Sequence, residues 1–464
     1  MAGSPRSAGR AGNSQDFATG SRLGIARDLI ELSAPTERVL LVGAPLKRSG
    51  GARVSAGARG RTMDEHLEEL DQLVDTAGGK VVGTLTQQLD RPNPATYLGK
   101  GKIEELTQRV TETGATLIVF DDELTPAQGK NVEDATGRRV MDRAELILDI
   151  FATRARSSEA KMQVELAQLQ YMLPRLTRMW AHLERFKGGI GMRGPGETQL
   201  ETDRRLINQR IKTLRQRLEE VERSREVQRS GRRDAFRASL VGYTNAGKSS
   251  ILRGLSEAPE VFVEDRLFAT LDPLTRDVNI GENYPVVLTD TVGFIRKLPH
   301  DLVASFRATL SEVREADLLL HVLDASHPQW EEQLSVVNEV LAEIEAQEKP
   351  VVHVFNKVDQ LDAAGLALLQ DRVRGEMPNA VFVSAVAEDG LEPLRRSLLG
   401  SLRAQRPLIE LRVPAHDGRV IAEIHREGEV IEQWVDGDEV VIAARLAPEL
   451  AARLQSRNHG AVAP

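Results

Sequence analysis

Short apolar runs alternate with amphipathic segments over residues 37–149. The runs have strand length, and the segments between them have the three- and four-residue spacing of helices. The strand-like runs are residues 38–42, 81–86 and 116–120, and the helical segments are residues 62–77 and 100–113. Because strands that alternate with helices form parallel sheets, we predict an α/β domain over residues 37–149. Residues 1–36 are rich in Ser, Gly, Ala and Arg without apolar periodicity, which predicts a disordered tail.

Two longer apolar stripes follow, with spacings that alternate between three and four. The first consists of Met162, Leu166, Leu169, Leu173, Leu176, Trp180 and Leu183, and the second of Leu200, Ile207, Ile211, Leu214, Leu218 and Val221. Such stripes predict two helices. The short glycine-rich loop between them, residues 188–198, predicts an antiparallel helical hairpin, a coiled coil, over residues 150–234. Pro174 lies inside the first stripe and should kink that helix.

A second α/β pattern covers residues 235–404, and a smaller pattern ends the chain. The predicted strands of the second domain are residues 238–241, 286–289, 318–323, 351–355 and 380–383. In residues 405–464, three strand-like runs and a closing helix predict a small α+β domain whose sequence contains no chemistry that we can identify. Those runs are residues 409–413, 430–435 and 439–443.

The composition excludes several classes of protein. The 464 residues include no cysteine, which excludes disulfides, thiolate zinc sites and cysteine nucleophiles and suits a reducing compartment. No apolar run approaches the roughly 18 residues that span a bilayer, and the N-terminus lacks the apolar segment of a signal peptide. We therefore expect a cytoplasmic protein with no membrane partner.

The charge of the chain is unevenly distributed. Residues 151–237 contain 20 Lys and Arg against 11 Asp and Glu, a local net charge of +9. Since the whole chain has a net charge of −8, the remainder carries −17. A basic hairpin in an acidic protein is a candidate surface for nucleic acid. From charge alone, an ordinary solvated helix pair is an equally good explanation.

The strand at residues 238–241 leads directly into GxxxxGKS, a sequence that binds nucleotide phosphates. Its residues are Gly242, Tyr243, Thr244, Asn245, Ala246, Gly247, Lys248 and Ser249. The glycines let backbone N–H groups surround phosphate oxygens, and the helix N-terminus that follows adds partial positive charge. We expect Lys248 to contact the β- and γ-phosphates as a catalytic residue and the Ser249 hydroxyl to ligate Mg²⁺.

A second motif ends the next apolar strand of the same domain. It is Asp290-Thr291-Val292-Gly293. The Asp290 carboxylate should lie beside the magnesium ion, and Gly293 should offer its N–H to the γ-phosphate, so both are candidate catalytic residues. A DxxG sequence is common by itself. This one is informative because it ends a strand about 40 residues after the phosphate-binding loop.

Two later strand ends predict the recognition of guanine. Asn356-Lys357-Val358-Asp359 follows the strand at residues 351–355, and Ser384-Ala385-Val386 follows the next strand. The Asp359 carboxylate can accept hydrogen bonds from N1–H and the 2-amino group of guanine, and adenine has neither donor. Charge-assisted hydrogen bonds contribute roughly 1.5–3 kcal/mol each, which gives a strong preference. A backbone N–H of the second motif should complete the base pocket. Four motifs in this order predict a GTPase.

The loop after the phosphate-binding helix must supply the second magnesium ligand. Phe268, Ala269, Thr270, Leu271 and Asp272 lie in this loop, followed by Thr275. From the residues alone, Thr270 and Thr275 are both candidates.

Two positions bear on the rate of hydrolysis. Phe294 stands where Ras-like GTPases carry a glutamine that orients water, and a phenyl ring cannot do so, so unaided hydrolysis should be slow. Asn245 stands where potassium-stimulated GTPases carry an asparagine that helps to hold K⁺, which makes K⁺ a candidate activator. Bracing of the loop is an equally good explanation of Asn245.

Several segments resemble the HflX family of ribosome-associated GTPases. They are residues 97–102 (YLGKGK), 140–160, 188–201 (GGIGMRGPGETQLE) and 265–273 (DRLFATLDP). The resemblance covers about residues 39–406, and GMRGPGETQLE is far more specific than the phosphate-binding sequence. It implies a protein that contacts the RNA of the large ribosomal subunit through its N-terminal domain and hairpin and dissociates or rescues ribosomes under stress. It also implies that Thr270 is the switch threonine, a magnesium ligand and a catalytic residue, within a nucleotide site that includes residues 268–272.

Two functions are compatible with these residues. One is an enzymatic switch that binds the ribosome in its GTP form, and the other is an RNA-remodelling protein whose nucleotide only stabilises the fold. The presence of Lys248, Ser249, Thr270 and Asp290 favours the switch. A second nucleotide site in the N-terminal domain has weak support, since residues 99–102 (GKGK) lack the full phosphate-binding pattern. We expect GTP and GDP as ligands and a monomer when the protein is not bound to a subunit.

Overall fold

The computed structural model describes residues 36–45, 65–176, 195–230, 236–256, 266–281, 284–298 and 307–457. The chain divides into two units, Met1–Thr36 and Glu37–Pro464, and the second contains every helix and strand reported below. The predicted disordered tail lies outside the described residues, apart from Thr36.

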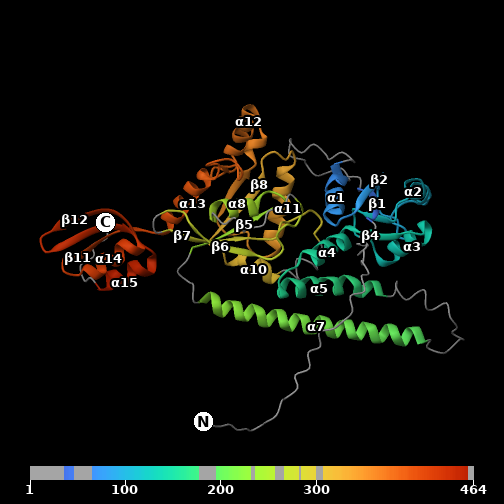
Figure 1. Cartoon of the computed structure of the whole chain (residues 1–464), viewed down its shortest axis with the longest axis horizontal. Helices are drawn as coiled ribbons and strands as arrows, with labels where there is room; N and C mark the ends of the chain where they lie inside the picture. The colour runs from blue at the N-terminus through green and yellow to red at the C-terminus, as the bar shows by residue number, and fades with distance from the viewer. Residues whose placement is uncertain are drawn as a thin grey trace, which may run out of the picture. The chain divides into compact units, whose positions relative to one another are not determined.

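The N-terminal part of the second unit is a parallel α/β domain, as predicted (Figure 1). Four parallel strands form a sheet in the order β2-β1-β3-β4. The strands are β1 (Arg38–Gly43), β2 (Lys80–Thr86), β3 (Leu117–Phe120) and β4 (Arg139–Asp142). The helices are α1 (Glu65–Thr76), α2 (Lys100–Thr113), α3 (Pro126–Thr136) and α4 (Arg143–Arg154). Neither α3 nor β4 was predicted, and the predicted domain boundary at residue 149 falls inside α4.

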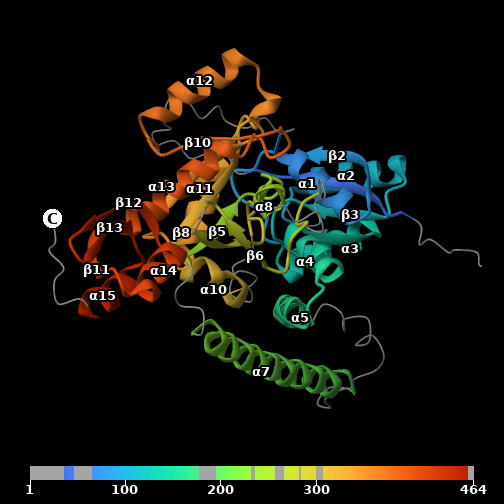
Figure 2. The same cartoon turned by 60° about the vertical axis from the view of Figure 1, so that its left-hand side comes forward.

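A helical hairpin follows, in which α5 (Ser158–Met172) packs against α7 (Pro195–Ser230) (Figure 2). Leu166 packs with Ile211, Leu214 and Leu218 in its apolar seam, so the predicted stripes do meet. Two ion pairs fix the direction of the helices: Glu159 with Arg225 at 2.7 Å and Glu165 with Arg210 at 2.6 Å. Since a higher number on one helix faces a lower number on the other, the hairpin is antiparallel.

Two details of the predicted hairpin need correction. The first helix ends at Met172 instead of continuing with a kink, because Pro174 cannot donate a helical hydrogen bond and lies in a 3₁₀ turn, η1 (Leu173–Arg175). The second helix starts inside the predicted loop, because proline suits the first helical position and α7 begins at Pro195. Trp180, Leu183 and residues 188–194 of the loop lie outside the described residues.

The nucleotide-binding domain contains a six-stranded sheet in the order β10-β9-β8-β5-β7-β6. Its strands are β5 (Phe236–Gly242), β6 (Leu274–Asn279), β7 (Pro285–Asp290), β8 (Leu318–Asp324), β9 (Val351–Asn356) and β10 (Val381–Phe382). Its described helices are α8 (Lys248–Ser256), α10 (Arg307–Glu315), α11 (Trp330–Glu343), α12 (Ala363–Arg374) and α13 (Glu392–Gln405). All five predicted strands form, and the sixth, β6, was missed and pairs antiparallel with β7. The parallel strands deliver their carboxyl ends, which carry the predicted motifs, to one edge of the sheet.

The C-terminal region is the predicted small α+β domain. An antiparallel sheet in the order β11-β13-β12 packs with two helices. Its elements are β11 (Leu408–Pro414), α14 (Gly418–Glu427), β12 (Glu429–Asp436), β13 (Glu439–Arg445) and α15 (Pro448–Arg457). Of these elements, α14 was not predicted. Among the described helices of the whole chain, none combines the length and the apolar character that crossing a membrane requires.

Candidate nucleotide site

The phosphate-binding loop connects β5 to α8, and its glycines are required by close contacts. Gly247 has a φ of +95°, and a Cβ atom there would lie 2.1 Å from the Asn356 amide nitrogen. At Gly242 a Cβ atom would lie 2.3 Å from the Val322 carbonyl oxygen. Side chains at these two positions would force the loop away from the neighbouring strand ends. The loop is therefore held as a fixed, open turn at the start of α8.

Lys248 is buried within this loop and is held by the loop's own backbone. Its Nζ donates to the carbonyl oxygens of Gly242 at 3.1 Å and Tyr243 at 2.7 Å. Burial lowers the pKa of Lys248 to about 8, against the opposing attraction of Asp290. Among the described residues, the buried Lys248 amine has no anion close enough to balance its charge, so the site is suited to an anionic ligand. A bound anion would favour the protonated form of Lys248.

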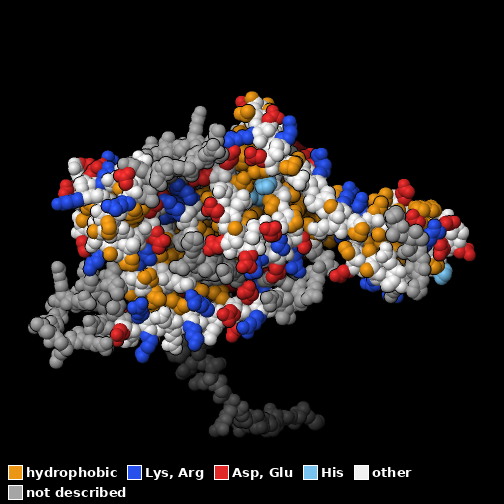
Figure 3. Space-filling view, turned by 180° about the vertical axis from the view of Figure 1, so that it is seen from behind, with side chains coloured by type: hydrophobic (Ala, Val, Ile, Leu, Met, Phe, Trp, Pro, Cys, Tyr) orange, Lys and Arg blue, Asp and Glu red, His pale blue; other side chains and the backbone are white. Residues whose placement is uncertain are grey.

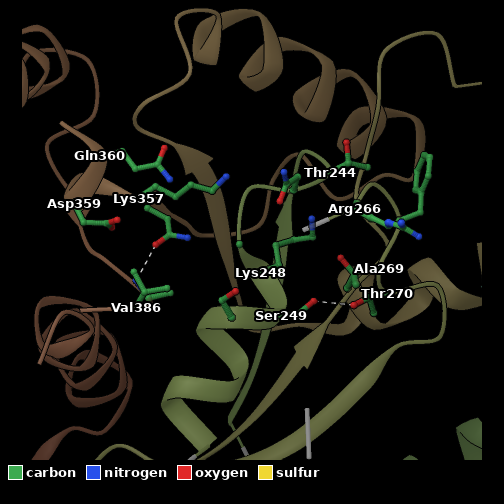
Figure 4. Close-up of a pocket in the computed structure, with 18 residues that line it drawn as sticks. Thr244, Lys248, Ser249, Arg266, Ala269, Thr270, Lys357, Asp359, Gln360 and Val386 are labelled. Carbon is green, nitrogen blue, oxygen red and sulfur yellow. Dashed lines mark hydrogen bonds between the residues drawn. The ribbon is translucent and has the colours of Figure 1, made fainter. Parts of the chain in front are cut away.

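The side chains of Ser249, Thr270 and Asp290 are joined by hydrogen bonds. Ser249 and Thr270 line the pocket (Figure 4). The Ser249 hydroxyl lies 2.8 Å from the Thr270 hydroxyl, and the two donate to the same Asp290 oxygen, Oδ2, at 2.6 and 2.9 Å. Asp290 is completely buried, and its other oxygen, Oδ1, has no hydrogen-bond partner among the described residues. Burial raises the pKa of Asp290. Two hydroxyls and a partly unsatisfied carboxylate form a set of oxygen atoms that suits a hard divalent cation.

The opposite end of the pocket is built by two loops that brace each other. The Asn356 side chain donates to the Ala246 carbonyl at 2.9 Å and accepts from the Ala385 N–H at 3.1 Å, so it connects the phosphate-binding loop to both later motifs. The Ser384 hydroxyl donates to Asp359 Oδ1 at 2.5 Å. Lys357 has a positive φ of 65° and pairs with Asp324 at 2.7 Å. Asp359 is thereby oriented at the end of the pocket away from Ser249 (Figure 4).

Phe294 contributes its backbone to the site, whereas its ring lies in the core. Its N–H donates to the Gly242 carbonyl at 3.1 Å, and its carbonyl accepts from the Thr244 N–H at 2.8 Å. The ring is 2 % exposed and belongs to the apolar core. The neighbouring Gly293 needs its lack of a side chain, because a Cβ atom would lie 2.8 Å from Thr244 Cα.

Most of the residues proposed from sequence line the pocket, but nine do not. Those that line it are Thr244, Asn245, Gly247, Lys248, Ser249, Phe268, Ala269, Thr270, Thr291, Gly293, Asn356, Lys357, Asp359, Ala385 and Val386. Those that do not are Gly242, Tyr243, Ala246, Leu271, Asp272, Asp290, Val292, Val358 and Ser384. Several of the second group brace the first group, as Asp290 and Ser384 do. Thr275, the alternative to Thr270, lies on β6 and bonds to the Thr289 hydroxyl at 3.0 Å instead.

Three lining residues were not predicted. They are Ser250, Arg266 and Gln360. Ser250 and Gln360 directly follow predicted residues, so chain proximity was an available signal. Arg266 belongs to the segment 265–273 (DRLFATLDP), but no role was predicted for its side chain, and its position depends on how residues 266–273 fold back onto the phosphate-binding loop.

Tyr243 and Asp272 point out of the pocket toward the N-terminal half of the chain. The Tyr243 hydroxyl donates to Glu69 of α1 at 2.7 Å and accepts from the Arg296 N–H at 2.9 Å. Asp272 accepts from the backbone at the start of α5. The phosphate-binding loop and the loop that carries Thr270 are therefore each hydrogen-bonded to elements outside the nucleotide-binding domain.

This arrangement defines a P-loop GTPase that is preceded by an α/β domain and a helical hairpin. Three family models match these regions in order: "GTP-binding GTPase N-terminal" over residues 64–152, "GTP-binding GTPase Middle Region" over 154–232 and "50S ribosome-binding GTPase" over 237–357. The chain belongs to the HflX GTPase family. The predicted family and enzyme class are confirmed: this is a GTPase that binds guanine nucleotides and hydrolyses GTP.

The relatives match most of the chain. GTPase HflX of Flavobacterium psychrophilum is 48 % identical over 359 residues, which cover 74 % of this chain and 86 % of that protein. GTPase HflX of Escherichia coli is 46 % identical over 376 residues, which cover 81 % and 88 %. A crystal structure of a GTP-binding protein from Sulfolobus solfataricus in complex with GDP is 25 % identical, covers 79 % of this chain and 98 % of its own, and has a TM-score of 0.41.

Proposed function

We propose that this GTPase is a magnesium-dependent switch that binds the large ribosomal subunit in its GTP form and dissociates or rescues ribosomes under stress. The observation that supports the proposal is that the GTP pocket and the arginine-bearing hairpin belong to one folded unit. Hydrogen bonds to Asp272, in the loop that carries Thr270, join the two. The family model that matches the nucleotide-binding domain is described as a 50S ribosome-binding GTPase, which agrees with this partner.

Ser249 and Thr270 are the proposed magnesium ligands, with Asp290 beside the ion. GTPases of this fold use Mg²⁺ to neutralise charge that develops on the phosphates. The fit rests on the donor set: the two hydroxyls are 2.8 Å apart, and a buried carboxylate oxygen of Asp290 is without a partner in the described part of the chain. Both hydroxyls donate to Asp290 Oδ2, so the three side chains converge on one point.

The remaining site residues have distinct proposed roles. Lys248 exchanges its two carbonyl acceptors for phosphate oxygens, and the Gly293 N–H is the proposed donor to the γ-phosphate. Asp359 accepts from the guanine base while Ser384 holds it in position, and the loops of Asn356 and Ala385 enclose the base.

Unaided hydrolysis is expected to be slow. The Phe294 ring is in the core, so the position that orients water in Ras-like enzymes supplies no polar group here. Asn245 lines the pocket with a positive φ of 60° and is the proposed K⁺ contact. Replacing K⁺ by Na⁺ should then lower turnover, and equal turnover in both salts would remove this assignment.

The proposed RNA contact is the exposed side of α7. Arg204, Arg205, Arg215 and Arg217 are exposed and form no ion pair within the described residues. In the view from behind, Lys and Arg side chains are interspersed with Asp and Glu side chains along the lower edge (Figure 3). Arg210 is also exposed on α7, but it pairs with Glu165 and so serves the hairpin itself. We further propose that the protein acts on its ribosomal partner as a monomer in the cytoplasm.

Sedimentation tests the proposed partner directly. The protein is mixed with purified large subunits and either a non-hydrolysable GTP analogue or GDP, then separated on a sucrose gradient. We expect co-sedimentation with the analogue and little with GDP. Equal binding in both states, or none, would favour a second candidate function. In that case the protein would remodel RNA, and its nucleotide would only stabilise the fold. The exposed α7 arginines are the observation that supports this second candidate.

A further inference from the structure

The loop that carries Thr270 is attached at both ends to elements that precede the nucleotide-binding domain. Two side chains of residues 266–273 contact these elements. The Phe268 ring contacts α4, and the Asp272 carboxylate contacts the start of α5. Thr270 lies between these two contacts, two residues from each. We call residues 266–273 the switch loop.

The first attachment is aromatic. The Phe268 ring is 2 % exposed and meets the Phe151 ring of α4 edge to face, with 4.6 Å between the ring centroids. Phe268 also has a φ of +56°, a backbone conformation that costs a bulky residue free energy and persists where packing enforces it. Phe151, which is completely buried, provides that packing.

The second attachment is a set of hydrogen bonds at a helix start. Asp272 Oδ2 accepts from the backbone N–H groups of Arg156 at 3.2 Å and Ser157 at 3.1 Å. Asp272 Oδ1 accepts from the Ser157 hydroxyl. Ser157 is also the N-cap of α5, where its hydroxyl accepts from the Ala160 N–H at 3.0 Å. The carboxylate thus satisfies donors at a helix N-terminus that would otherwise have no intrahelical acceptor.

From these contacts we infer that the α4–α5 junction clamps the switch loop, so that Phe151, Ser157 and Asp272 are positioning residues for Thr270 and its magnesium ion. The inference rests on the magnesium role proposed for Thr270. Two residues of extended chain span at most about 7 Å, so Thr270 stays near Ser249 and Asp290 while both attachments hold. A partner that moves α5 would release the switch loop, and the occupied metal site would in turn favour the observed position of α5.

The test measures how nucleotide binding depends on magnesium, with no turnover required. A fluorescent non-hydrolysable GTP analogue is bound to the full chain over a MgCl₂ series, for wild type, Thr270→Ala, Asp272→Ala and Asp272→Asn. Asp417→Ala is the matched control, because Asp417 caps α14 through the Val420 N–H at 3.2 Å and is outside the nucleotide-binding domain. Binding of fluorescent GDP without MgCl₂ shows that each variant retains its phosphate and base contacts.

We expect Thr270→Ala and Asp272→Ala to raise the MgCl₂ concentration for half-maximal analogue binding at least fivefold. Asp272→Asn, which keeps one acceptor oxygen, should fall between Asp272→Ala and wild type. Asp417→Ala and all magnesium-free GDP affinities should stay within twofold of wild type. In hydrogen exchange, the amides of residues 268–271 should exchange faster in Asp272→Ala than in Asp417→Ala.

The two ways of failing are distinguishable. If Thr270→Ala shifts the magnesium dependence and Asp272→Ala does not, the clamp is wrong and the metal role of Thr270 stands. If Thr270→Ala itself leaves the magnesium dependence unchanged, the proposed metal role is wrong, and the clamp inferred from it is wrong as well. Faster exchange in both Asp→Ala variants would assign the effect to general loosening and would also overturn the clamp.

Discussion

At the scale of single residues, the side chains proposed to bind the nucleotide and its metal ion are held in place by hydrogen bonds to neighbouring side chains. Ser384 orients Asp359, and Asn356 connects the phosphate-binding loop to the base loops. Asp290 gathers the two hydroxyls of Ser249 and Thr270. Such bracing keeps the polar groups in place before the nucleotide arrives, which reduces the ordering cost of binding.

Asp359→Asn should reverse the base preference. The amide can no longer accept from both N1–H and the 2-amino group of guanine, and it can pair with xanthine instead. We expect at least a tenfold loss of GTP affinity and a gain in XTP affinity, measured by equilibrium binding. If the unmodified protein binds ITP, GTP and ATP equally well, Asp359 does not select guanine.

His321 should make the folding stability depend on pH. It is completely buried on β8, and neither ring nitrogen has a hydrogen-bond partner among the described residues. Burial lowers the pKa of His321 to about 3, with His353 and Lys248 adding repulsion. Because the folded-state pKa is below the unfolded value, protonation favours unfolding: stability is full above about pH 6.5 and falls as the pH drops toward 3.

Comparison with His321→Leu isolates this effect. Relative to the variant, wild type should lose about 2 kcal/mol of unfolding free energy between pH 7.5 and pH 5, since one pKa unit corresponds to about 1.4 kcal/mol. Denaturant unfolding of the nucleotide-free protein at both values provides the measurement. His353→Leu is the control, because His353 is only half-buried and should show a smaller effect. Parallel pH profiles for wild type and His321→Leu would contradict the assignment.

At the scale of elements, the hairpin joins two functions in one helix pair. Its seam of Leu166, Ile211, Leu214 and Leu218 gives it a defined register, and Glu159 and Glu165 neutralise two of its arginines. Arg204, Arg205, Arg215 and Arg217 remain exposed. This division separates residues that build the hairpin from residues that are available to a polyanion.

Arg204→Ala/Arg205→Ala should weaken the salt dependence of subunit binding. Each lost phosphate contact should reduce the slope of log affinity against log salt by roughly one unit or less, because fewer counterions are released. The measurement is the affinity of the analogue-bound protein for large subunits over a salt series. Arg210→Ala is the control, since Arg210 already pairs with Glu165 and should change the slope less. Identical slopes for the double variant and wild type would make the hairpin a structural spacer.

The sequence predicted elements well where apolar residues dominate and poorly where they are few. All of β3 is buried, and its run of Leu, Ile, Val and Phe was predictable. In contrast, β6 (LTRDVN) is an edge strand whose antiparallel pairing with β7 no local pattern announces, and α3 buries a single large apolar residue, Val132. The site residues at the ends of apolar strands were predictable for the same reason as β3. The position of Arg266 and the hydrogen-bond partner of Asp272 depend on how the switch loop folds, and no local sequence motif encodes that folding.

At the scale of the whole molecule, the nucleotide site is connected to the regions that would meet the ribosome. Tyr243 bonds to Glu69 of α1, Lys297 pairs with Asp121 at 2.6 Å, and Asp272 receives the start of α5. Coupling between binding sites is reciprocal, so if the nucleotide shifts these contacts, a partner that binds the shifted N-terminal half must in turn alter nucleotide affinity. The proposed lack of a water-orienting side chain at Phe294 would suit regulation of this kind.

We propose that large ribosomal subunits are the partner that completes the active site. The most direct measurement is the rate of GTP hydrolysis by the full chain in Mg²⁺ and K⁺, with and without purified large subunits. Small subunits provide the control. We expect slow turnover alone, at least a tenfold increase with large subunits, and no increase with small subunits. Fast turnover by the isolated protein, or the same rate with and without large subunits, would contradict the account.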